Sequence, residues 1–243
     1  MLILFTDYGA NDLYLGQVHA VLESHAPGMP RVDLFNDAPS FNVRASAHLL
    51  AALAGRFAPG SVMLAVVDPG VGSERAAAVM EADGRFYVGP DNGLLSVMAA
   101  RARQRRFWHI AWRPEAMSDS FHGRDLFAPI AAWIARGAFP TPRLKHVSGL
   151  DCDFGGEDLA ELIYLDHYGN AMTGLQASGL ARGARLVAGH RHIPYARVFS
   201  EVPEGEPFWH ENSIGLVEIS LNRGDAAREL GLVIGQHVTV LNS

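Results

Sequence analysis

The sequence is poor in lysine and in cysteine. Lys145 is the only lysine among 20 basic residues in a chain of 243, and Cys152 is the only cysteine. A single cysteine excludes a disulfide within the chain and a metal site built from several thiolates. Acidic residues number 26, so the formal net charge is −6, which argues against a general binder of nucleic-acid phosphates.

Long apolar runs are also missing. No stretch approaches the roughly 18 apolar residues that a transmembrane helix needs. The first apolar run ends at Thr6 and Asp7 and lacks the basic segment of a signal peptide. Hydrophobic residues still make up 49% of the chain, enough for one large core or two modest ones. We therefore expect a folded cytoplasmic protein with no membrane partner.

The first 140 residues alternate between strand-like and helix-like patterns. Apolar, β-rich runs predict strands, and longer runs rich in Ala and Leu predict helices. The predicted strands are 2–6, 31–35, 62–67, 86–88 and 107–111, and the predicted helices are 13–25, 43–57, 94–104 and 126–136. This alternation is typical of an α/β domain with a mostly parallel sheet.

The pattern changes beyond this region. Residues 137–156 lack periodicity and are rich in proline, glycine and acids. Short β-rich runs follow, separated by glycines, with one short helical pattern at 225–230; the runs are 161–165, 185–188, 215–220 and 237–241. We predict an N-terminal α/β domain over 1–145, a linker over 146–157, and a smaller antiparallel β domain, a sandwich or barrel, over 158–243.

A glycine-rich turn follows the predicted strand 62–67. It reads DPGVGSER and runs from Asp68 to Arg75. Ligands of open α/β sheets bind beyond the carboxyl ends of the strands, and glycines let backbone amides approach them closely. Asp68 is therefore either a carboxylate that faces a ligand or only the cap of a turn, and the spacing alone leaves both open.

Two other segments of the N-terminal half carry candidate functional groups. Asp7 directly follows the first predicted strand, where a carboxylate can accept hydrogen bonds from two ribose hydroxyls, whereas Asp12 is better explained as a helix N-cap. His122 lies in the segment FHGRD before a predicted helix. It is either a structural histidine or the third member of an Asp–Arg–His set with Asp68 and Arg75.

The C-terminal half contains two polar turns that suit a ligand with a planar base and a zwitterionic tail. Asp166, Tyr168 and Asn170 place an acid, an aromatic ring and an amide within five residues. Ser213 lies in a second turn, which leads into the strand that contains Glu218. Both segments also fit ordinary hairpin turns without a ligand.

Together these segments resemble the S-adenosyl-L-methionine (SAM) hydroxide adenosyltransferase family, also called SAM hydrolases, which are relatives of fluorinase and chlorinase. Six motifs occur in the expected order over nearly the whole chain: TDYG (6–9), VVDPGVGSER (66–75), GPDNG (89–93), FHGRDLFAP (121–129), DHYGN (166–170) and NSIGLVEI (212–219). Six ordered motifs are far more specific than any one of them.

The resemblance implies a fold, an assembly and a reaction. It implies an N-terminal α/β domain, a smaller β domain, and a homotrimer in which the ligand lies between the N-terminal domain of one subunit and the C-terminal domain of its neighbour. The implied reaction is attack of water or hydroxide on C5′ of SAM, which gives adenosine and L-methionine. It implies no metal and no organic cofactor.

The resemblance also implies residue roles. Asp68, Arg75 and His122 would handle the water, and Asp7 would bind the ribose. Halogenating relatives have a tyrosine in place of Asp68 and lack the Asp–Arg–His set, which favours water as the nucleophile here. The other implied substrate-binding residues are Asp166 for the methionine amino group, Tyr168 and Asn170 for the adenine, Ser213 for the methionine carboxylate, and Glu218 in the same motif as Ser213.

Two other functions stay open. A metal-dependent nucleoside hydrolase would use acids such as Asp7 and Asp12, but Asn11 stands where such a site wants a second, adjacent aspartate. A non-catalytic sensor of adenosine or SAM would not need a complete Asp–Arg–His set. Chelation and product analysis distinguish these functions from SAM hydrolysis.

Overall fold

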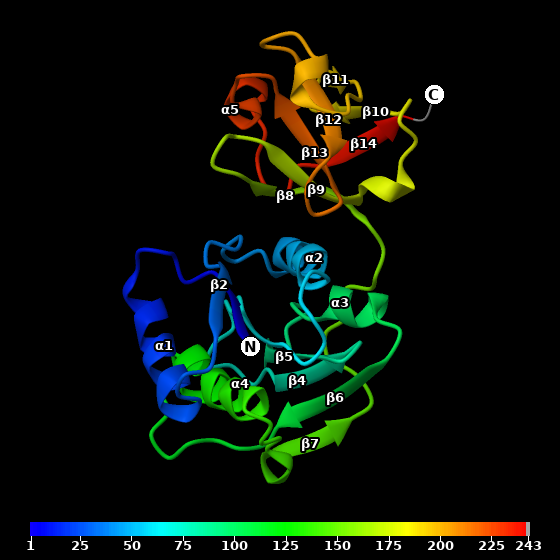
Figure 1. The fold of residues 1–243 in the computed structure, drawn as a ribbon. Coiled ribbons are helices and arrows are strands. Elements are labelled where there is room, and N and C mark those ends of the chain that lie inside the picture. Colours follow the sequence, from blue (N-terminus) through cyan, green and yellow to red (C-terminus); the bar gives the residue numbers. More distant parts are fainter. Residues whose placement is uncertain (242–243) are drawn as a thin grey trace. The chain divides into compact units, whose positions relative to one another are not determined.

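The computed structural model describes residues 1–241 (Figure 1). The chain divides into two compact units, Met1–Gly156 and a second unit that begins at Glu157.

The first unit contains a seven-stranded sheet in the order β2-β1-β3-β5-β4-β6-β7. The pairs from β2 to β5 are parallel and those from β5 to β7 are antiparallel, so the α/β class is confirmed but the sheet is mixed rather than mostly parallel. The cause is a two-residue turn at Asp83 and Gly84, both with positive φ, which reverses the chain between β4 and β5. The strands are β1 (Leu2–Thr6), β2 (Arg31–Phe35), β3 (Val62–Val66), β4 (Ala77–Ala82), β5 (Arg85–Pro90), β6 (Arg105–Ile110) and β7 (Leu144–Val147).

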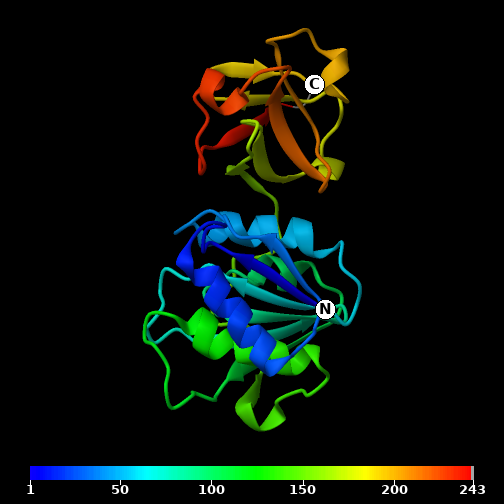
Figure 2. The ribbon, with the colours of Figure 1, turned by 60° about the vertical axis from the view of Figure 1, so that its left-hand side comes forward.

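Helices cover both faces of this sheet (Figures 1 and 2). Helices α1 (Leu13–His25) and α4 (Ala128–Ala135) pack together on one face, and α2 (Val43–Ala54) and α3 (Ser96–Arg101) lie together on the other. As predicted, Asp12 caps α1, since its carboxylate accepts a hydrogen bond from the Leu13 amide at 2.6 Å. The predicted helices 94–104 and 126–136 are shorter in the structure, because β6 begins at Arg105 and because residues Gly123–Phe127 form a π-helical turn.

Strands β1 and β3 are buried on both faces, as their continuous apolar sequences predict. Leu2 and Leu4 pack with Leu64 of β3 and with Val18 of α1. The two strands are parallel and in register, with Thr6 opposite Val66. The residues that follow them therefore emerge at the same edge of the sheet, and these include Asp7 and Asp68.

The segment predicted as a linker, residues 146–157, lies against the first unit over most of its length. It begins inside β7, and the amides of Asp151 and Phe154 donate hydrogen bonds to Asp91 at 3.0 Å and to Ser96 at 3.1 Å. The Phe154 ring lies so close to Gly93 that an added Cβ there would be 2.4 Å from the ring. The polar, glycine-rich composition of this segment therefore reflects tight turns that contact the turn after β5 and the start of α3.

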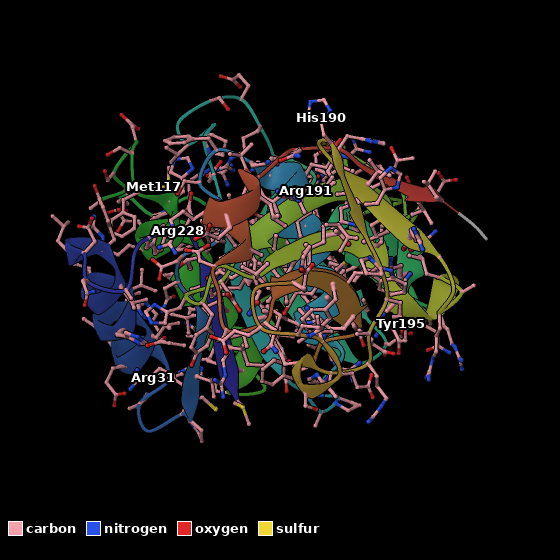
Figure 3. The ribbon with its side chains drawn as sticks, turned by 90° about the horizontal axis from the view of Figure 1, so that it is seen from above. Arg31, Met117, His190, Arg191, Tyr195 and Arg228 are labelled. Carbon is pink, nitrogen blue, oxygen red and sulfur yellow. The ribbon has the colours of Figure 1, made fainter. Side chains whose placement is uncertain are left out.

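The second unit consists of two antiparallel sheets, which confirms the predicted β domain. The sheets have the orders β12-β13-β9-β8 and β11-β10-β14, and Trp209 is buried in the core they share, with its indole N–H donating to the Ala184 carbonyl at 3.0 Å. His190 and Arg191 mark the hairpin between β10 and β11 (Figure 3). The elements are β8 (Leu159–Leu165), β9 (Ala171–Gln176), β10 (Arg185–Ala188), β11 (Arg191–Ile193), β12 (Pro207–Glu211), β13 (Leu216–Leu221), α5 (Ala226–Leu230) and β14 (Val238–Leu241).

Among the described helices of either unit, none has the length and apolar character to cross a bilayer.

Candidate active site

Two carboxylates emerge from adjacent strand ends in the first unit. The Asp7 amide donates a hydrogen bond to the Val66 carbonyl at 3.3 Å, and Asp68 follows two residues after Val66. The pKa of Asp7 is raised to about 6. Burial is the main cause, a backbone hydrogen bond opposes it, and the negative charge of Asp68 adds to the rise. The Asp7 carboxylate therefore titrates just below neutral pH.

Asp68 forms a two-pronged ion pair with Arg75. Arg75 Nε donates to Asp68 Oδ1 at 2.7 Å, and Nη2 donates to Oδ2. The side chains are only 6% exposed for Asp68 and 10% exposed for Arg75. The turn between them needs Gly72, which has φ 80° and approaches the Asp119 carbonyl so closely that a Cβ would lie 2.9 Å from its oxygen. A bidentate pair of this kind fixes the orientation of both groups.

His122 completes the set. Arg75 Nη2 lies 3.2 Å from His122 Nδ1, and the imidazole belongs to a residue that is 8% exposed. Because a guanidinium only donates hydrogen bonds, Nδ1 is the acceptor, and a neutral ring then carries its proton on Nε2. Burial lowers the pKa of His122, Arg75 lowers it further and Asp68 opposes this, so the ring is neutral at pH 7. The structure thus brings Asp68, Arg75 and His122 together.

Tyr8 lies close to these three residues. A Cβ added to Gly123, the residue after His122, would lie 1.6 Å from the Tyr8 hydroxyl oxygen, so this close approach requires glycine. Burial raises the pKa of Tyr8, and both Asp7 and Asp68 act on it in the same direction. Among the described residues the buried hydroxyl has no hydrogen-bond partner. The sequence placed Tyr8 beside Asp7 but contained no signal for this unpaired hydroxyl.

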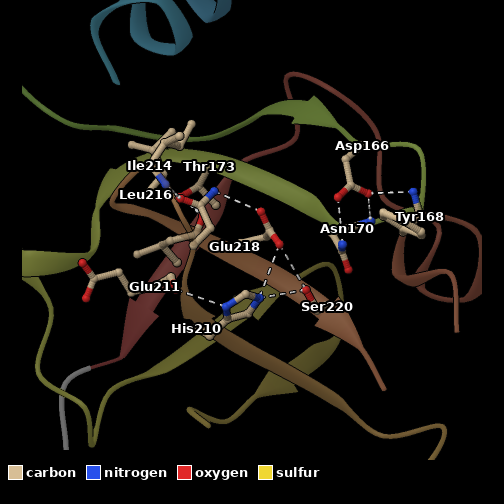
Figure 4. A network of polar contacts seen from close by, with 12 residues as sticks. Asp166, Tyr168, Asn170, Thr173, His210, Glu211, Ile214, Leu216, Glu218 and Ser220 are labelled. Carbon is tan, nitrogen blue, oxygen red and sulfur yellow. Dashed lines mark hydrogen bonds and ion pairs between the residues drawn. The ribbon is translucent and has the colours of Figure 1, made fainter. Parts of the chain in front are cut away.

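In the second unit, Asp166 organises the turn that carries Tyr168 and Asn170. Its Oδ1 accepts the amides of Tyr168 at 2.9 Å and Asn170 at 2.8 Å, and its Oδ2 accepts the Asn170 side-chain amide at 2.8 Å (Figure 4). Tyr168 is 75% exposed. A cleft of about 580 Å³ opens beside this turn, and its lining residues are Asp166, Tyr168, Asn170, Phe199, Leu221, Arg223 and Gly224.

Glu218 lies beneath the surface, within a network that supports the turn containing Ser213 (Figure 4). Glu218 is 5% exposed, and its Oε2 accepts the Asn212 side-chain amide at 3.0 Å. Asn212 Oδ1 in turn accepts the amides of Ile214 and Leu216 at 3.1 and 3.0 Å. Ser213 is exposed on this turn. The carboxylate of Glu218 thus supports the turn through Asn212, and a contact between Glu218 and the substrate stays a prediction.

His210 is a member of this network that the sequence did not reveal. Its Nε2 lies 3.3 Å from Glu218 Oε1 and 3.1 Å from Ser220 Oγ. His210 and Glu218 are opposite each other in the β12–β13 pair. Only the strand register brings them together, and that register was not available from the sequence.

The arrangement defines a class: a two-unit protein with a polar site at the carboxyl edge of a mixed α/β sheet and a second unit built from antiparallel β-sheets. Both units match models of a single family, the SAM hydroxide adenosyltransferase N-terminal domain over residues 2–144 and its C-terminal domain over residues 160–239. The chain belongs to the SAM hydroxide adenosyltransferase family.

Curated relatives and solved structures agree with this membership. The chain is 37% identical to a protein named (R)-S-adenosyl-L-methionine hydrolase from Thermus thermophilus, over 97% of each chain. It is 34% identical to a protein of the same name from Salinispora arenicola, over 97% of this chain and 95% of that one. A crystal structure of an uncharacterized conserved protein from Thermotoga maritima superposes with a TM-score of 0.90 at 30% identity, covering 99% of this chain and 100% of the other.

Proposed function

We propose that this protein hydrolyses SAM to adenosine and L-methionine by attack of water on C5′ of the ribose. The observation that carries the proposal is that the largely buried side chains of Asp68, Arg75 and His122 contact one another. The chain's relatives are named SAM hydrolases. A non-catalytic binder would have no need for this set.

The chemistry requires a positioned nucleophile more than an acid. The sulfonium of SAM leaves as a neutral thioether, so no proton has to be delivered to it. Holding water in line with C5′ supplies up to about 7–11 kcal/mol of barrier reduction in favourable cases. We assign proton acceptance to Asp68, because His122 Nδ1 is occupied by Arg75 and the remaining Nε2–H is a donor. His122 then holds the water oxygen, and Arg75 orients the Asp68 carboxylate.

We propose that this step uses no metal. The guanidinium of Arg75 binds both oxygens of Asp68, and a cation already in that position disfavours a second one. The test is incubation of the purified protein with SAM, with and without EDTA, followed by chromatography. Adenosine and methionine should form equally in both. Loss of turnover in EDTA would indicate a metal-dependent hydrolase, and tight binding without turnover would indicate a sensor.

We further propose roles for the substrate-binding residues. Asp7 binds the ribose hydroxyls, Tyr168 and Asn170 the adenine, Asp166 the methionine amino group and Ser213 the methionine carboxylate. The cleft beside Tyr168 is lined by two exposed aromatic residues, Tyr168 and Phe199, and by the amide of Asn170, which supports the adenine assignment. We also propose that the enzyme is a cytoplasmic homotrimer with its sites at subunit interfaces. Light scattering of the purified protein tests the number of subunits.

The affinity for adenosine is expected to fall in acid. Asp7 has a pKa of about 6, so it is mostly ionised at pH 7 and mostly protonated at pH 5. Only the ionised carboxylate can accept hydrogen bonds from both ribose hydroxyls, so Kd for adenosine should rise about tenfold when the pH is lowered from 7 to 5. The Asp7→Asn variant should bind adenosine weakly at both pH values. The control is Asp12→Asn, which keeps a side chain that can cap α1 and should behave like the wild type. Equal pH dependence in Asp7→Asn and wild type would remove Asp7 from the ribose site.

Glu218→Gln is expected to raise KM for SAM several-fold with little change in kcat. The substitution removes the charge that holds Asn212 and His210, so the turn that carries Ser213 should loosen. A hydrogen bond to a buried charged group contributes about 1.5–3 kcal/mol, so thermal stability should also fall. Glu211→Gln, on an exposed residue of the same hairpin, is the control. An unchanged KM in Glu218→Gln would mean that the network does not position Ser213.

A further inference from the structure

A second cluster of metal-ligating side chains lies in the first unit, separate from the residues proposed for hydrolysis. Asp91 follows β5, His109 lies in β6, and Asp151 follows β7. His109 Nε2 is 3.2 Å from Asp91 Oδ2 and 3.6 Å from Asp151 Oδ2. One potential ligand atom from each of the three residues lies within 4.8 Å of the other two.

We propose that this cluster binds a divalent transition-metal ion, with Zn²⁺ as the best-fitting ion, through Asp91 Oδ2, His109 Nε2 and Asp151 Oδ2. Zinc binds histidine nitrogen and carboxylate oxygen at about 2.0–2.2 Å in tetrahedral geometry, which places ligand atoms roughly 3.4 Å apart. The two separations from His109 Nε2, 3.2 and 3.6 Å, lie on either side of that value. The imidazole favours zinc and its neighbours in the periodic table over Mg²⁺ or Ca²⁺.

The carboxylate of Asp91 is held in place before any ion arrives. Its side chain is fully buried, and it accepts the amide of Asp151 on Oδ2 at 3.0 Å and that of Cys152 on Oδ1 at 3.4 Å. A carboxylate offers about four lone-pair positions, so these bonds leave room for a metal. Hydrogen bonds that orient a ligating carboxylate are typical of metal sites.

The charge at the cluster also favours a cation. In the part of the chain that the structure describes, neither Asp91 nor Asp151 forms an ion pair with lysine or arginine; His109 is their ion-pair partner. Lys145 is opposite His109 in the β6–β7 register but is not within ion-pair distance of either carboxylate. Two neighbouring carboxylates, one of them fully buried, carry negative charge that a divalent ion would neutralise.

The site is open on one side. The Asp151 side chain is 64% exposed and that of His109 is 26% exposed, so an ion can enter from solvent and water can complete its coordination. The bound ion would link the turn after β5, strand β6 and the segment after β7. Asn92, next to Asp91, donates a hydrogen bond to the Val67 carbonyl at 2.9 Å, so the ion would stabilise the region beside Asp68 without touching it.

The experiment is calorimetric titration of ZnCl₂ into the whole 243-residue chain after EDTA treatment and removal of EDTA. One Zn²⁺ per chain should bind and raise Tm. The variant pair His109→Ala and Asp151→Asn should each weaken binding at least about tenfold and abolish the shift in Tm. Both residues are partly exposed, so each variant is expected to fold, and circular dichroism checks this. The double variant His190→Ala and His192→Ala, on the exposed β10–β11 hairpin, controls for binding by surface histidines.

The proposal is wrong if the wild type binds no Zn²⁺, since the cluster is then only a hydrogen-bonded contact. It is equally wrong if binding survives in the His109 and Asp151 variants, or is lost instead in the His190 and His192 variant. SAM hydrolysis is measured in parallel on the metal-free protein. If the metal-free protein hydrolyses SAM at the full rate, the Asp91–His109–Asp151 cluster is not needed for the proposed reaction. The two proposals can then fail independently of each other.

Discussion

Asp68→Asn is expected to lower kcat for SAM hydrolysis by about 10²–10⁴-fold, the usual contribution of a general base. Asparagine has nearly the same shape as aspartate but cannot take the proton of the attacking water. It also leaves the buried guanidinium of Arg75 without its charged partner. Because ribose and adenine contacts are proposed for other residues, adenosine should still bind with a Kd close to that of the wild type.

The control for this variant is Glu74→Gln, which removes an exposed acid from the same turn. Its kcat should equal that of the wild type. Calorimetric titration with adenosine shows whether Asp68→Asn retains a formed binding site. Wild-type turnover in Asp68→Asn, in a sample free of contaminating hydrolase, would eliminate Asp68 as the proton acceptor.

Gly89→Ala is expected to reduce the free energy of unfolding by about 3 kcal/mol or more, because overpacking of a rigid contact is costly. An added Cβ would lie 2.1 Å from the Ala65 carbonyl oxygen, a backbone atom of the neighbouring strand. Strands β3 and β5 would have to separate at that point, directly before the chain reaches Asp68. Hydrolysis should therefore fall as well.

Urea unfolding measures this effect as a lower transition midpoint with an unchanged m value. Gly55→Ala is the matched control, since Gly55 has φ −62° and an added Cβ there meets nothing within 4 Å. That variant should be unchanged or slightly more stable, because alanine restricts the unfolded chain. Equal midpoints for the two variants would contradict the close approach of β3 and β5.

The sequence was most informative where one physical requirement dominated. The run from Leu2 to Thr6 is apolar throughout, as a strand covered on both faces must be, and the predicted boundaries of β1 agree with the structure. Strand β4 was missed because Ala77–Ala82 contains residues that favour helices, and pairing on both sides overrides that preference. The Asp83-Gly84 pair was the available signal for a hairpin.

The site was predictable to the extent that its residues lie in motifs. Asp68, Arg75 and His122 were singled out by sequence context, and the structure places them in contact. The pairing of His210 with Glu218 depends on strand register, and the meeting of Asp91 with His109 depends on the order of strands in the sheet. Neither order nor register is encoded in local spacing, so these contacts could not have been predicted from the chain alone.

The single lysine has a practical consequence. Lys145 is exposed on β7, and apart from the terminal amine it is the only group that an amine-reactive dye can label. Its cross-strand neighbour is His109, and side chains opposite each other in an antiparallel pair lie about 5 Å apart. A fluorophore on Lys145 would therefore lie beside the Asp91–His109–Asp151 cluster, and its emission is expected to respond to ion binding there, in a chain that needs no engineering to carry the label.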